Sequence, residues 1–270
     1  MTSAPARGQP DDLPAFRDAG HGYDVFGLDP RAARRAARLC GPLYRRYFRV
    51  TSTGSEHLPA TGAAILVANH AGTLPVDGAM LWLDVMAHSG RVLRPVADLF
   101  VAAFPIVNTV FARIGVVSGT RQNVRHLLET GELIAIFPEG TTGVAKPFRE
   151  RYRLQAWRVG HAELAIRHRV PVIPVAIIGS EESWPVAFKL RGVRAFGAPY
   201  LPIPASPVPL PVRYHLHYGA PLVLHRDHPP EAADDPATAA AAAERVKVAL
   251  VDLIARGLEA RRAGAVGARR

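Results

Sequence analysis

Short apolar runs alternate with amphipathic segments along most of this chain. Apolar-rich runs that end at turn-forming or polar residues are typical of buried strands. They occur at 48–52, 63–68, 92–96, 115–118, 133–137, 170–178 and 212–218. Apolar residues at helical spacing occur between them, at 78–87, 122–129 and 158–168. This alternation predicts an α/β fold, a single domain with a mostly parallel or mixed central sheet flanked by helices.

The N-terminal part is predicted to contain a flexible segment and then a basic helix. Residues 1–23 are rich in Pro, Gly and Asp and have few apolar side chains, so we expect them to be flexible. Asp29 can cap a helix over 31–40, with Pro30 at its first position. The Gly41-Pro42 pair should break or kink that helix.

The rest of the chain is predicted to form one domain over 24–262, with a basic helical region at 29–49 and a motif-bearing core at 48–179. Six prolines between 192 and 211 predict a long irregular connection and argue against central strands there. An Ala-rich segment with apolar residues at helical spacing predicts a closing helix over 236–262. The Ala/Gly/Arg tail, 263–270, is expected to be flexible.

Composition indicates a globular protein. The chain has 270 residues, of which 49% are hydrophobic and 21% charged, enough to bury a substantial core. Its single cysteine, Cys40, excludes an internal disulfide and a cysteine-based zinc site. The polar start lacks the apolar stretch of a secretory signal, so we expect a cytoplasmic protein. The most apolar stretch, 99–117, is interrupted by Pro105, Asn108 and Arg113, so no transmembrane helix is expected.

The formal charge of +10 is concentrated in two segments. Residues 31–49 carry seven arginines and no acid, and 145–170 carries seven Lys or Arg against two glutamates. Such segments attract nucleic acid, anionic membrane or an acidic protein. No zinc-finger spacing, aromatic-rich RNA-binding signature or repeat is present, so nucleic-acid binding is not expected.

The basic helix has two interpretations. Its apolar and aromatic residues lie among the arginines, an arrangement that suits an anionic membrane surface. The same pattern also fits a helix packed on the core with its arginines in water. The sequence leaves both open; the residues in question are Leu39, Leu43, Tyr44, Tyr47 and Phe48.

The strongest chemical signal is a histidine and an aspartate just past a predicted buried strand. His70 and Asp77 follow the run 63–68. A neutral imidazole can take a proton from an alcohol, and a carboxylate partner fixes its tautomer and stabilises the imidazolium. If the intervening residues were helical, the two would lie about 10 Å apart along the axis. Gly72 and Pro75 are placed to shorten that path as a flexible residue and a helix breaker.

This pair is the first of four sequence blocks in a characteristic order. The others are Gly115-Val-Val-Ser-Gly-Thr-Arg121, Phe137-Pro-Glu-Gly-Thr141 and Val170-Pro-Val-Ile-Pro-Val175. Together they resemble the motifs of the glycerophospholipid acyltransferase family, which includes the 1-acylglycerol-3-phosphate acyltransferases. The resemblance covers about 48–179.

The resemblance implies an enzyme that moves an acyl chain from an acyl thioester of coenzyme A or acyl carrier protein to a hydroxyl of a glycerol-based lipid, for example a lysophospholipid. It implies His70 as general base and Asp77 as its partner. Substrate binding would fall to Gly115, Arg121, Glu139, Gly140 and Thr141. An apolar cleft would take the acyl chain, and backbone amides near Gly72 or Gly140 could stabilise the oxyanion. We expect no cofactor or metal, and a peripheral location on the inner membrane face.

Two departures from the family pattern matter. Six residues separate His70 from Asp77, where the family has four, and Pro75 occupies the usual aspartate position. Thr142 stands where the family usually has an arginine after the Phe-Pro-Glu-Gly-Thr block, so a phosphate anchor is missing. Two explanations stay open: the acceptor carries no simple phosphomonoester, or one of four cations further along replaces the anchor, namely Lys146, Arg149, Arg151 and Arg153.

Other chemistries have weaker support. The chain has no Gly-x-Ser-x-Gly elbow and no dinucleotide-binding glycine loop. Its C-terminal histidines lack a matching carboxylate or cysteine, which argues against a metal site; they are His215, His217, His225 and His228. The remaining alternative is a catalytically inactive lipid- or membrane-binding protein that keeps the acyltransferase fold.

Overall fold

A mixed β-sheet forms the centre of the protein. The computed structural model describes residues 17–71, 75–98, 105–140, 143, 146–195 and 198–267. In that part of the chain the central sheet has seven strands in the order β1-β9-β6-β2-β5-β3-β4. Their bounds are β1 Thr51–Thr53, β2 Ala64–Ala68, β3 Arg94–Ala97, β4 Val117–Ser118, β5 Leu133–Ile136, β6 Val172–Ile178 and β9 His215–Tyr218. The five strands from β6 to β4 are parallel, and β9 pairs antiparallel with β6.

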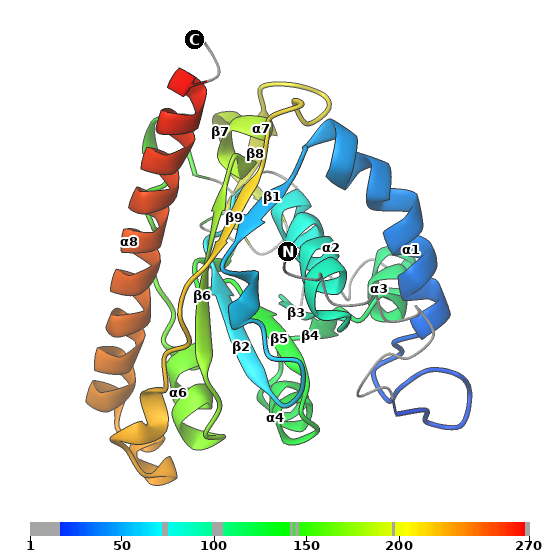
Figure 1. The fold of residues 1–270 in the computed structure, drawn as a ribbon, viewed down its shortest axis with the longest axis vertical. Coiled ribbons are helices and arrows are strands. Elements are labelled where there is room, and N and C mark those ends of the chain that lie inside the picture. The colour runs from blue at the N-terminus through cyan, green and yellow to red at the C-terminus, as the bar shows by residue number, and fades with distance from the viewer. Residues whose placement is uncertain are drawn as a thin grey trace, which may run out of the picture.

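Helices cover both faces of this sheet (Figure 1). One face packs against α1 (Pro30–Pro42) and α2 (Val76–Ser89), and the other against α4 (Arg121–Glu129), α6 (Gly160–Arg167) and α8 (Pro236–Gly267). Leu66 points into the first core, whereas Ile65 and Val67 point into the second, because successive strand side chains alternate between faces. The predicted α/β class with a mixed central sheet is confirmed.

Short elements connect these layers. They are α3 (Pro105–Arg113), α7 (Ser180–Ser183), a π-helical turn at Leu43–Tyr47, and 3₁₀ turns at Ser55–His57, Phe148–Glu150, Leu224–Arg226 and Pro230–Asp234. The π-helical turn, α7 and the C-terminal end of α8 lie near the carboxyl edge of the parallel strands (Figure 1).

The N-terminal helix begins as predicted but ends differently. The Asp29 carboxylate accepts hydrogen bonds from the amides of Arg31 and Ala32, and Pro30 occupies the first turn. Of the two outcomes predicted at Gly41-Pro42, a break or a kink, the break does not occur: the helix includes Pro42 and continues into the π-helical turn. Proline removes one amide donor, and the wider turn closes with the Phe48 amide donating to the Leu43 carbonyl at 2.8 Å.

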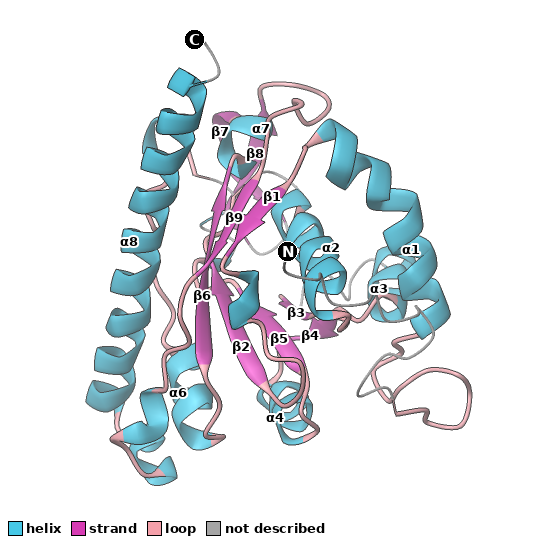
Figure 2. Ribbon diagram, viewed as in Figure 1, coloured by secondary structure: helices cyan, strands magenta, loops and turns pink. Residues whose placement is uncertain are grey.

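The proline-rich segment also differs from the prediction. Strands β7 (Val186–Ala195) and β8 (Ala198–Pro204) form an antiparallel sheet of two strands, separate from the central sheet (Figure 2). The prolines are accommodated because each strand of a two-stranded sheet has an unpaired edge, where no amide donor is needed. The expectation that this segment forms no central strand is confirmed.

Both ends of the chain depart in part from expectation. Residues 1–16 and 268–270 lie outside the described residues. Residues 17–23 include a turn in which one Asp18 oxygen accepts from three backbone amides. At the other end α8 continues to Gly267, beyond its predicted end at 262. Among the described helices, none combines the length and apolar character needed to cross a bilayer.

Candidate active site

The turn that follows β2 places His70 at the carboxyl edge of the sheet. Asn69, fully buried, continues the pairing with β6 through its side chain. Its Nδ2 donates to the Ile177 carbonyl at 2.9 Å, and its Oδ1 accepts from the Ile177 amide at 2.7 Å. Because the Asn69 side chain makes these two hydrogen bonds, the backbone can leave the strand while the amide and the carbonyl of Ile177 keep their partners. His70 is therefore presented from a fixed point.

His70 and Asp77 are in direct contact. His70 Nδ1 lies 2.7 Å from Asp77 Oδ2. Asp77 is the second residue of α2 and fully buried, and its carboxylate also accepts from the amides of Ala71 at 2.9 Å and Gly78 at 2.7 Å. Three donors and the positive end of α2 hold its negative charge.

The lengthened spacer does not separate the pair, because α2 begins only at Val76. Pro75 immediately precedes the helix and accepts from the Ala79 amide at 3.0 Å, so it starts the helix instead of breaking one. Gly72, which was expected to shorten the path, lies outside the described residues.

The surroundings of His70 favour its protonated form. Burial alone would lower the pKa of His70, but the charge and hydrogen bond of Asp77, together with the charge of Glu139, outweigh burial and raise it, while Lys146 opposes them. The imidazole stacks at a tilt on Phe137 with ring centroids 4.5 Å apart. Since Nδ1 is bonded to Asp77, Nε2 is the nitrogen placed to exchange a proton with a substrate. The His70 side chain is 13% exposed.

Glu139 lies beside His70, but its side chain is directed into the protein interior and not toward solvent. Strand register aligns the two positions just beyond the ends of β2 and β5. Its Oε1 accepts from the His70 amide at 3.0 Å, and its Oε2 accepts from the Gln155 amide at 2.7 Å and lies 3.2 Å from Lys146 Nζ. With 1% exposure, Glu139 is placed to hold the backbone of the general-base candidate.

Gly140 lies next to an arginine that the sequence analysis did not single out. Gly140 has φ +54°, and the guanidinium of Arg158 comes within 3.2 Å of where its Cβ would be. The Arg158 amide donates to the Pro138 carbonyl at 3.2 Å, which fixes this exposed cation beside the Phe-Pro-Glu-Gly block. The only sequence signal for Arg158 is its place in the basic segment 145–170. Thr141 and Thr142 lie outside the described residues.

The other predicted binding residues lie away from the pair. Arg121 begins α4 after β4, three strands from β2, with its side chain 89% exposed and 3.3 Å from a Glu163 oxygen. Gly115 precedes β4, at the amino end of the parallel strands and so at the end opposite to His70. Its carbonyl accepts from Arg94 Nε at 2.9 Å. The structure therefore does not bring Gly115 to His70.

The four cations suggested as replacement anchors differ in accessibility. Arg149, Arg151 and Arg153 are exposed. Lys146 is buried between two carboxylates, with 2% of its side chain exposed, so it does not face an acceptor from solvent.

The described residues contain no group of three or more potential ligands that could hold a metal ion. His215 and His217 instead contact the hydroxyls of Thr51 and Thr53, at 3.0 and 2.8 Å.

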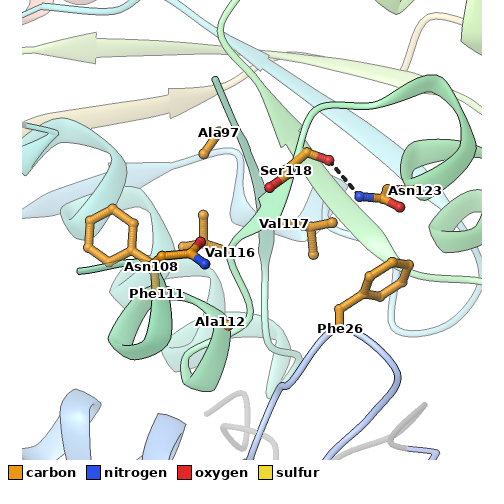
Figure 3. Close-up of a pocket in the computed structure, with 9 residues that line it drawn as sticks. All are labelled: Phe26, Ala97, Asn108, Phe111, Ala112, Val116, Val117, Ser118 and Asn123. Carbon is orange, nitrogen blue, oxygen red and sulfur yellow. Dashed lines mark hydrogen bonds between the residues drawn. The ribbon is translucent and has the colours of Figure 1, made fainter. Parts of the chain in front are cut away.

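A cavity of about 200 Å³ lies beside the β3–β4 side of the sheet (Figure 3). Phe26 and Phe111 lie on opposite sides of it, and the side-chain Nδ2 of Asn123 donates to the Ser118 carbonyl at 3.1 Å. The other described lining residues are Ala97, Asn108, Ala112, Val116 and Val117. The histidine–aspartate pair is not among them, so this cavity is separate from the pair.

Comparisons with known proteins identify the family and the fold of this chain. The Acyltransferase family matches residues 49–178. An uncharacterised Mycobacterium tuberculosis protein, Rv0502, is 36% identical over 257 residues, covering 90% of this chain and 71% of that protein. A Bos taurus protein named DGAT1/2-independent enzyme synthesizing storage lipids is 30% identical over 207 residues, covering 74% of this chain and 58% of that protein.

A solved structure shares the fold. The Thermotoga maritima 1-acyl-sn-glycerophosphate acyltransferase PlsC aligns with a TM-score of 0.54 at 18% identity, covering 82% of this chain and 79% of that chain. The sheet and the flanking helices share the PlsC fold, and the family match identifies an acyltransferase. The chain belongs to the Acyltransferase family.

Proposed function

We propose that this protein transfers an acyl chain from an acyl thioester, of coenzyme A or acyl carrier protein, to a hydroxyl of a glycerol-based lipid such as a lysophospholipid. The observation that carries the proposal is the 2.7 Å contact between His70 Nδ1 and Asp77 Oδ2 at the carboxyl edge of the sheet. That edge is where open α/β sheets bind their ligands. The contact also argues against a catalytically inactive lipid- or membrane-binding protein, because His70 and Asp77 remain in contact despite the longer spacer between them.

The chemistry follows from the pair. His70 Nε2 takes the proton of the acceptor hydroxyl as its oxygen attacks the thioester carbonyl, and Asp77 stabilises the imidazolium. The tetrahedral intermediate collapses with loss of the thiolate, which receives the proton from His70. A thioester is already activated, so alignment and a base suffice without a covalent enzyme intermediate. The Gly140 amide donates to the Phe137 carbonyl at 3.0 Å, so it is not placed to stabilise the oxyanion.

We assign to Arg158 the binding of the acceptor's acidic group. Its guanidinium is exposed and lies against Gly140, which in the sequence is two residues before the position of the family's motif arginine. A guanidinium can bind a phosphate through two hydrogen bonds, which suits the head group of a lysophospholipid.

The central experiment uses labelled acyl-coenzyme A or acyl carrier protein with a panel of lysolipid acceptors. His70→Ala should abolish transfer, while His21→Ala, at an exposed histidine on the N-terminal turn, should retain it. Transfer by the His70→Ala variant at the unchanged rate would remove His70 from the mechanism. Lipid binding by the purified protein, without transfer to any acceptor, would favour the inactive alternative.

We further propose that α1 and the π-helical turn contact anionic membrane. Leu39 is 79% and Leu43 46% exposed, and Arg45 and Arg46 are exposed beside them. The face of α1 that packs on the core carries small residues such as Ala33. The leucines lie outside that face and are free to contact a lipid surface.

The membrane proposal is tested with phosphatidylglycerol vesicles. Arg45→Glu/Arg46→Glu should reduce sedimentation with them, whereas the charge-matched Arg245→Glu/Arg256→Glu, at exposed positions of α8, should not. Equal sedimentation of both double variants would refute the assignment of this surface.

A further inference from the structure

Behind the histidine–aspartate pair lies a buried row of three charged side chains, which we call the Lys146 bridge: Glu139, Lys146 and Glu181. Lys146 Nζ lies 3.2 Å from Glu139 Oε2 and 2.9 Å from Glu181 Oε1. The side chains are 0%, 2% and 5% exposed, in that order. Burying charge is expensive unless each group is paired, so this geometry indicates a specific role.

The bridge connects the ends of three strands. Glu139 follows β5 and, through Oε1, accepts from the amide of His70, which follows β2. Glu181 lies in α7, directly after β6, and its other oxygen accepts from the Tyr152 amide. Lys146 belongs to the segment between β5 and α6, so a single ammonium joins the turns after β5 and β6 around the backbone of His70.

We propose that Lys146 is a positioning residue for the general base: it fixes the Glu139 carboxylate so that Glu139 holds the His70 main chain, and its positive charge balances the carboxylates behind the imidazole. The inference rests on the proposed role of His70. It also assigns a function to Lys146 different from that of an acceptor anchor.

Charge accounting supports this role. The groups that face His70 are Asp77 from α2, and Glu139 and Lys146 from the segment after β5. Glu139 raises the pKa of His70, and Lys146 lowers it. Burial raises the pKa of Glu181, although Lys146 opposes that change. The lysine thus opposes the effect of burial on Glu181 and lowers the basicity of the imidazole.

The test compares three variants of the full chain. Lys146→Met removes the ammonium while retaining much of the side-chain volume. Lys146→Met/Glu181→Gln also removes the carboxylate charge that would be left unpaired. Lys247→Met removes a lysine from α8, where it lies 3.5 Å from Glu244, and is the control. Each is measured for thermal unfolding, for kcat/KM against pH, and for the pKa of His70 by NMR titration.

We expect Lys146→Met to lower kcat/KM by about tenfold to 100-fold, because the base is displaced from its productive position. The pKa of His70 should rise and the acidic limb of the pH profile should move to higher pH, because the lysine charge that lowers this pKa is gone. The double variant should unfold near the wild-type temperature yet keep the shifted pKa and the lower kcat/KM. Lys247→Met should match wild type.

The double variant decides between positioning and plain structural support. If it restores wild-type kcat/KM and the wild-type pKa of His70, Lys146 only neutralises Glu181 and the proposal is overturned. The same comparison decides the matter if Lys146→Met alone does not fold. Failure of the proposed function is separate: wild type would then transfer no acyl group, while the NMR titration would still show whether Lys146 acts on His70.

Discussion

Replacing Asp77 with asparagine tests the centre of the proposed mechanism with almost no change in shape. Asp77 accepts from His70 Nδ1 and from the amides of Ala71 and Gly78. The Ala71 amide shares Oδ2 with His70, whereas the Gly78 amide bonds Oδ1. Asparagine has one acceptor oxygen and loses the carboxylate charge in either orientation. In the orientation that keeps the Gly78 hydrogen bond, its NH₂ group takes the place of Oδ2 and faces His70. Nδ1 then becomes the acceptor, and the proton moves to Nε2, where the base must be unprotonated. We expect kcat to fall by about 10³–10⁴-fold, which corresponds to about 4–5.5 kcal/mol in the activation barrier.

The pH profile provides an independent test, because the direction in which it shifts is also predicted. Burial lowers the pKa of His70, and Asp77 is the main group that raises it. Without the carboxylate charge the pKa should fall, so the acidic limb of kcat/KM should move to lower pH while the plateau drops.

The assay follows release of free thiol from acyl-coenzyme A in the presence of acceptor. Asp252→Asn, at an exposed position of α8, is the matched control and should retain wild-type kinetics. A kcat of Asp77→Asn within threefold of wild type, or an acidic limb displaced to higher pH, would refute the reasoning.

Three further predictions concern stability and acceptor binding. Arg94 is fully buried, so Arg94→Met should lower the free energy of unfolding by about 3–5 kcal/mol in urea titrations; a loss below about 1 kcal/mol would contradict this. The folded-state pKa of His70 is raised, so its ionised pair with Asp77 stabilises the fold below the unfolded pKa and is lost as pH rises through the folded value. His70→Gln should therefore destabilise more at pH 6 than at pH 9, and the reverse order in urea midpoints would show the sign to be wrong. Arg158→Gln should raise the acceptor KM about tenfold with little change in kcat, and an unchanged KM for phosphate-bearing acceptors would exclude that contact.

Local patterns predicted most of the regular elements because each reflects a short-range rule. The continuous apolar run before His70 is β2, fully buried on both faces, as expected for a central parallel strand. The cap formed by Asp29 and the closing helix α8 were predictable for the same reason, since capping and helical periodicity involve residues a few positions apart.

The misses occur where a local signal has two outcomes. No helix was predicted at 105–113, yet α3 begins at Pro105, a position that tolerates proline because the missing amide would have no intrahelical partner. The prolines of β8 fit a strand because that strand belongs to a sheet of only two. Composition cannot distinguish these cases, because the choice depends on neighbours far away in sequence.

At the site, the residues available for catalysis can be recognised in the chain: a histidine, an aspartate and a glutamate just past the ends of buried strands. How these residues act depends on the contacts that folding creates. The start of α2 at Val76 brings Asp77 to His70 across the longer spacer. Strand register places Glu139 under the His70 amide, and the ends of β5 and β6 enclose Lys146. The physical reason is that motif residues follow from local strand and turn patterns, whereas hydrogen-bond partners and burial are set by which strands become neighbours.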